Sequence, residues 1–153
     1  MLTIRFTKLS DARHRFECVR ADGTRDSVEL ETRSFLLHDL IHLAVETEAG
    51  LTQSFYGALA TGRGYGELSD MGPPAGELSM TEAVVAVMTN AAKGQATPAQ
   101  AIAGLKNLLD AHGDAMPPWL TEAFVERALE RLRRLQGQWK ATRFGETMEL
   151  TFG

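Results

Sequence analysis

The sequence contains one cysteine, few aromatic residues and no long hydrophobic run, and each shortage excludes a class of protein. Cys18 alone can form neither an intramolecular disulfide nor a cysteine-rich zinc site. The longest apolar run, residues 83–88, is far shorter than the ~20 residues that cross a bilayer. Residues 1–6 lack the apolar core of a signal peptide. We therefore expect a cytoplasmic protein without a membrane partner.

An excess of positive charge is also missing. The chain has 16 Lys and Arg residues against 20 Asp and Glu residues, a formal net charge of −4, which argues against nucleic acid as a partner. Its 153 residues, 44% hydrophobic and 24% charged, predict a single domain, 1–153, with an ordinary core. The acidic residues concentrate in the middle of the chain. We expect the two basic ends to lie together on one face.

Both ends of the chain alternate between apolar and polar residues. Three alternating segments within residues 1–33, with Asp22-Gly23 at the second turn, predict a three-stranded antiparallel meander. Residues 138–144 and 147–152 flank Gly145-Glu146 and predict a C-terminal hairpin over 137–153. Because an isolated hairpin is marginally stable, we expect it to join the meander in one sheet of about five strands.

Between the two ends, residues 34–136 follow a helical period. The pattern predicts helices at 35–49, 51–61, 79–93, 98–111 and 118–136, and a long loop at 62–78. Strands at both ends with helices between them indicate an α+β fold, an antiparallel sheet with a central helical insert. Long loops in compact domains are often functional.

One predicted helix carries the strongest candidate for chemistry. His38, His42 and Glu46 recur every four residues, so at about 100° per residue they fall within about 80° of arc, apart from the apolar face. Asp39 lies at the edge of this polar stripe. Two histidines four residues apart can hold one metal ion. We therefore take His38, His42 and Glu46 as candidate ligands of a divalent metal such as zinc, and Asp39 and Glu46 as candidate catalytic groups.

The segment His38-Asp39-Leu40-Ile41-His42 resembles the H-D-x-x-H helix of zinc-associated helical families such as the ubiquinone-biosynthesis family. It is also similar to H-E-x-x-H metal-binding helices, with Asp39 in place of the glutamate. The ubiquinone-biosynthesis family continues with a glutamate where this chain has Ser54. Extended to Glu46, the segment resembles the HDLxHxxVE-type helix of small uncharacterised bacterial proteins. These resemblances imply metal binding on the helix but no particular reaction.

The same residues admit a structural interpretation. Asp39 and Glu46 are also suited to pair with arginines of the predicted sheet, with Arg5, Arg13 and Arg15 as candidates. A small-ligand pocket without metal is a further alternative. The third metal ligand stays open as well, with Glu48 and Glu67 as the other candidates beside Glu46.

Two classes of function follow from these alternatives. The leading expectation is a non-enzymatic interaction or regulatory module, a possible homodimer, in which the H-D-x-x-H helix is a structural polar cluster. The alternative is a metal-dependent hydrolase-like enzyme that uses His38, Asp39, His42 and Glu46.

Overall fold

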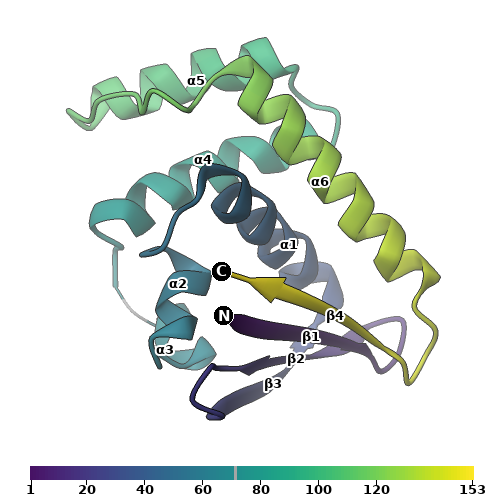
Figure 1. Ribbon diagram of the computed structural model, residues 1–153. Coiled ribbons are helices and arrows are strands. Elements are labelled where there is room, and N and C mark those ends of the chain that lie inside the picture. Colours follow the sequence, from purple (N-terminus) through teal and green to yellow (C-terminus); the bar gives the residue numbers. More distant parts are fainter. Residues whose placement is uncertain (71) are drawn as a thin grey trace.

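The fold is α+β, as the sequence predicts. A computed structural model describes residues 1–70 and 72–153. In chain order, the elements in these residues are β1 (Leu2–Lys8), β2 (Arg13–Val19), β3 (Arg25–Glu31), α1 (Thr32–Ala49), α2 (Phe55–Ala60), α3 (Tyr65–Asp70), α4 (Gly76–Ala92), α5 (Pro98–Ala111), α6 (Glu122–Ala141) and β4 (Thr147–Phe152). The helices cover one face of an antiparallel sheet (Figure 1).

The sheet has the order β3-β2-β1-β4. The predicted meander is confirmed, because β1 pairs with β2 and β2 with β3. Its alternating side chains Leu2, Ile4 and Phe6 are fully buried beneath the helices, which is the arrangement expected when one face of a sheet is dry and the other wet. Leu2 pairs with Phe152, so the two ends of the chain lie side by side in the sheet (Figure 1).

The expectation of about five strands is one too many, since the sheet of the described residues has four. Residues 138–144 do not form a strand, because α6 continues to Ala141. Trp139 explains the difference: from its helix it already packs edge-on to the His14 ring, and the Lys8 ammonium lies 4.6 Å from its centroid. Its apolar surface therefore reaches the sheet without a hairpin.

The helices agree with the predicted order but differ at several boundaries. The prediction for α5 is confirmed residue for residue, with a Thr97 capping box. The predicted loop 62–78 is only partly irregular, since it contains α3 and the start of α4. Met71 in that loop lies outside the described residues. Helix α1 is central, and its residues 39–46 are all buried between the sheet, α4 and α6.

The basic ends do lie side by side, as expected, and some of their arginines are paired with carboxylates. Arg5 of β1 forms a 2.8 Å ion pair with Glu149 of β4. Arg15 lies 3.7 Å from Glu29 on the same sheet. These exposed pairs offset part of the basic charge on this face of the sheet. Within residues 1–70 and 72–153, none of the helices has the length and apolar character needed to cross a membrane.

Candidate metal centre

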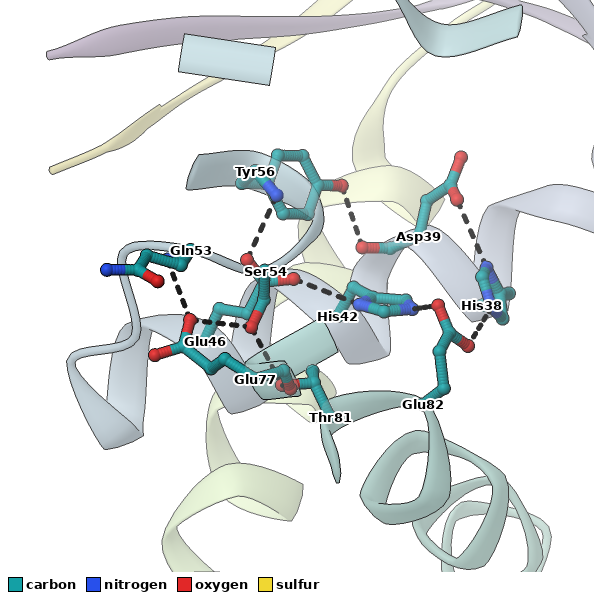
Figure 2. Close-up of polar contacts among 10 residues, drawn as sticks. All are labelled: His38, Asp39, His42, Glu46, Gln53, Ser54, Tyr56, Glu77, Thr81 and Glu82. Carbon is teal, nitrogen blue, oxygen red and sulfur yellow. Dashed lines mark hydrogen bonds and ion pairs between the residues drawn. The ribbon is translucent and has the colours of Figure 1, made fainter. Parts of the chain in front are cut away.

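Helix α1 places His38 and His42 one turn apart on the side that faces α4 (Figure 2). Their rings meet edge to face, with centroids 4.6 Å apart. The side chain of His42 is fully buried, whereas that of His38 is 45% exposed. His42 therefore lies in the interior, and His38 lies at the edge that solvent reaches.

Glu82 of α4 reaches both rings from the opposite side. Its Oε1 lies 3.0 Å from Nε2 of His42, and its Oε2 lies 3.6 Å from Nε2 of His38. Ligand atoms of these three residues all fall within 4.8 Å of one another. Bonds of about 2.0–2.1 Å in a tetrahedral zinc site place neighbouring ligand atoms about 3.3 Å apart. The spacing of the two imidazoles and the carboxylate therefore suits one metal ion.

The other ring nitrogen of each histidine faces a carboxylate. Nδ1 of His42 donates to Glu46 at 2.9 Å, and Nδ1 of His38 lies 3.3 Å from Asp39. Histidines that bind metals are commonly oriented in this way, with a carboxylate on the nitrogen that does not bind. Both Nε2 atoms are thus turned toward Glu82 (Figure 2).

Two tyrosines hold these carboxylates. The buried Glu46 accepts a 2.9 Å hydrogen bond from the backbone N–H of Tyr56, whose hydroxyl donates to the backbone carbonyl of Asp39 at 2.7 Å. The side chain of Asp39 accepts a 2.8 Å hydrogen bond from the hydroxyl of Tyr65. Both carboxylates are almost completely buried, so their positions, and those of the rings they contact, are well defined.

The buried Nε2 of His42 lacks a satisfactory hydrogen bond. Among the described residues no group meets it with hydrogen-bond geometry, although Glu82 is only 3.0 Å away. Nearly all buried polar atoms in proteins are paired, so an exception calls for an explanation. A metal ion held between Nε2 and Glu82 would satisfy both groups without requiring hydrogen-bond geometry between them.

Helix α4 is fixed in place next to Glu82. The hydroxyl of Ser54, just before α2, donates to Glu77 at 2.9 Å and contacts the hydroxyl of Thr81 at 2.8 Å. Ser54 and Thr81 are fully buried. These contacts tie α4 to α2 at the residue preceding Glu82 (Figure 2).

The charges of the cluster perturb its titration. Contacts with Asp39 and Glu82 raise the pKa of His38 to about 9. Burial lowers the pKa of His42, but Glu46 and Glu82 outweigh it and the net shift is upward. Burial alone would raise the pKa of Glu82, whereas its contacts with the two histidines hold it at about 2. The site thus strongly favours positive charge between Glu82 and the rings.

Of the predicted ligands, the structure brings His38 and His42 together and places Glu46 behind His42, on Nδ1. Glu48 lies elsewhere, with its carboxylate on Arg127 and Arg131. Glu67 pairs with Arg63. Neither Glu48 nor Glu67 belongs to the cluster of ligand atoms in the described chain.

The structural pairings considered for Asp39 and Glu46 are not those observed. In the part of the chain that the structure describes, Arg5 pairs with Glu149, and Arg13 and Arg15 face Glu29. The sheet arginines lie on the solvent side, because their neighbours in the strands turn inward. Asp39 and Glu46 are therefore held by histidine and tyrosine groups instead.

Sequence reasoning missed Glu82, and one signal could have found it. Glu82 is the single charged residue in positions 78–92, a stretch that otherwise reads as a buried helix. An isolated charge among apolar and small residues is a candidate for a buried role. The sequence separation between Glu82 and the two histidines, however, does not indicate that Glu82 faces them.

A cleft of about 360 Å³ adjoins the cluster. Its lining includes His38, Asp39 and Glu82 together with the rings of Phe55 and Tyr65. A larger groove of about 570 Å³ runs between α1 and α6, but its lining of leucines, Trp139 and basic side chains contains none of the cluster residues. The smaller cleft is therefore the one next to the candidate metal ligands, whereas the groove between α1 and α6 is larger but contains none of them.

Comparisons with protein-family models, with curated proteins and with solved structures found no match to this chain.

Proposed function

We propose that the protein binds a divalent metal ion through His38, His42 and Glu82. One observation carries the proposal: two Nε2 atoms and a carboxylate converge, while each Nδ1 is backed by a separate buried carboxylate. A polar cluster that only fills space does not require both rings to turn the same nitrogen toward one acid. Nε2 of His42 is buried and has Glu82 as its ion-pair partner at 3.0 Å without hydrogen-bond geometry, which is compatible with the same conclusion.

Zinc is the first candidate for the ion. Two imidazoles and one carboxylate form a ligand set that suits zinc and also iron, nickel and manganese. Three protein ligands leave one tetrahedral position open, a feature of catalytic rather than structural zinc sites. His38 and Glu82 are partly exposed beside the cleft, so the open position faces a space that small molecules can enter.

The reaction class that fits this arrangement is metal-dependent hydrolysis. A zinc ion with an open position lowers the pKa of bound water to about 7, and polarises a carbonyl oxygen. The backing carboxylates, Asp39 and Glu46, orient His38 and His42 in this proposal, and Asp39 also lines the cleft. The chain itself supplies the ligands, their orientation and a partly apolar cleft.

The test is metal analysis of the purified protein followed by titration. After chelator treatment, zinc is expected to rebind at one ion per chain and to raise the melting temperature. His42→Ala and Glu82→Gln should each weaken binding at least tenfold. His112→Ala is the matched control, because His112 is an exposed histidine at the end of α5. Equal affinity in the wild type and both site variants would refute the proposal.

The interaction module expected from the sequence is the second candidate. It predicts a mass that rises with protein concentration, measured by light scattering, and indifference to every divalent ion tested. The large apolar side chains exposed in the described chain are Met1, Phe35 and Phe144. Phe35 belongs to the cleft beside the cluster. The structure therefore offers more support for the metal site than for a homodimer surface.

A further inference from the structure

We infer that the cleft beside the cluster binds molecules that combine a planar apolar group with an oxygen donor for the metal, and discriminates against phosphate. The inference rests on the proposed metal site and concerns what that site accepts. It follows from the walls of the cleft, their charge and its size.

Part of the wall of the cleft is aromatic. Phe35 of α1, Phe55 of α2 and Tyr65 of α3 line it together with Leu68. The rings of Phe55 and Tyr65 stand at 90° with centroids 5.5 Å apart, and Phe55 also packs on His42 at 5.3 Å. Aromatic walls held in this way favour flat apolar groups, which stack on or meet the ring edges.

The charge of the cleft disfavours phosphate and other multiply charged anions. Among the described residues that line it, none is a lysine or an arginine, and its carboxylates are Asp39 and Glu82. A divalent ion would just balance these two negative charges. Sites that bind phosphoryl groups normally add arginine or lysine clamps to the metal. A phosphate bound to the metal ion would therefore contact no basic side chain and would lie close to two carboxylates.

The size of the cleft limits the ligand. A volume of about 360 Å³ lies at the lower end of the usual range for small-molecule pockets. Phe35 is 37% exposed at its mouth, where an incoming apolar group would cover it. The cleft thus suits one ring with a short polar substituent better than a polymer.

The experiment uses the full chain loaded with Co²⁺, whose visible spectrum reports ligand exchange. The probes are benzohydroxamate, acetohydroxamate and inorganic phosphate. The two hydroxamates present the same oxygen donors and differ in the phenyl group, and their affinity for free Co²⁺ is measured in parallel. We expect benzohydroxamate to bind at least tenfold more tightly than acetohydroxamate after this correction, and phosphate to bind more weakly than either.

Phe35→Ala tests the wall of the cleft. This variant should reduce the preference for benzohydroxamate to about threefold or less while Co²⁺ affinity stays unchanged. Phe144→Ala is the matched control, because Phe144 is also an exposed phenylalanine but lies outside this cleft, near Lys8. It should preserve the full preference.

The outcomes separate the two proposals. If Co²⁺ binds but the hydroxamates bind equally, if phosphate binds as tightly as benzohydroxamate, or if Phe35→Ala leaves the preference intact, the inference about the cleft is overturned and the metal site stands. If Co²⁺ and zinc both fail to bind, the proposed function is refuted, and this inference with it.

Discussion

Replacing Glu46 by glutamine removes one negative charge while keeping the shape of the side chain. In the wild type, Oε2 of Glu46 accepts from Nδ1 of His42 and Oε1 accepts from the backbone N–H of Tyr56, both at 2.9 Å. A glutamine has one oxygen and one NH₂ group at these positions. With the amide oxygen on the backbone N–H of Tyr56, the NH₂ group faces Nδ1 of His42, and two buried donors meet whenever that nitrogen carries a proton, as it does when Nε2 holds a metal ion.

The expected effects on stability and on metal affinity differ. Leaving a buried donor unsatisfied costs about 1–3 kcal/mol of the free energy of unfolding. Loss of a carboxylate behind a metal-binding histidine typically weakens metal affinity 10–100-fold, which corresponds to about 1.4–2.7 kcal/mol. In a purely structural cluster only the first effect exists. The loss of zinc affinity is therefore the diagnostic quantity.

The assay is zinc competition against a chromophoric chelator, with urea unfolding in EDTA as a separate measure of the metal-free protein. Glu48→Gln serves as the control, since Glu48 lies two residues along the same helix and contacts Arg127 and Arg131 instead of His42. We expect a weakened zinc affinity for Glu46→Gln alone. Wild-type zinc affinity in a folded Glu46→Gln protein would refute the reasoning.

Three further predictions concern stability. Burial lowers the pKa of His14, so below pH about 6.5 the unfolded chain binds a proton that the folded chain resists. Urea denaturation at pH 7.5 and 5.5 should show that the free energy of unfolding falls more steeply as the pH decreases in the wild type than in His14→Gln. Glutamine is chosen because its amide can replace the contact of His14 with Thr32. An equal loss of stability in the two proteins would contradict the prediction. Gly57→Ala should cost about 3 kcal/mol, because its Cβ would lie 2.0 Å from the carbonyl oxygen of Thr52. Gly104→Ala, in open space within α5, should instead stabilise by about 0.5–1 kcal/mol, and calorimetry that ranks the two variants alike would refute both.

The strands could be predicted from sequence because strict alternation of apolar and polar residues is typical of a half-buried strand and does not fit a helix. Leu2, Ile4 and Phe6 alternate with polar residues, and the alternation alone decides which face is buried. Residues 138–144 were ambiguous, since a short apolar pattern around Trp139 fits a strand or the end of a helix. The tertiary contacts of Trp139 with Lys8 and His14 decided in favour of the helix.

The candidate site was predictable only within one helix. The four-residue spacing fixes the relation of His42 to His38 and to Glu46, because helix geometry is local. The spacing does not say which ring nitrogen each carboxylate contacts. It therefore could not show whether Glu46 binds the metal itself or orients His42. Glu82 comes from α4, some forty residues on, and its approach depends on how α4 packs against α1, which no local pattern encodes.

In the metal-free protein, a proton on His38 supplies part of the positive charge that a metal ion would bring to the cluster. The pKa of His38 is raised to about 9, so at neutral pH its imidazole carries a proton on Nε2, and contacts with Glu46 and Glu82 raise the pKa of His42 as well. A metal ion on Nε2 of His38 must displace that proton. Zinc binding at pH 7 should then release at least one proton and strengthen as the pH rises toward 9. Calorimetry in buffers of different ionisation enthalpy measures this number, and binding without proton release would mean that Nε2 of His38 is not a ligand.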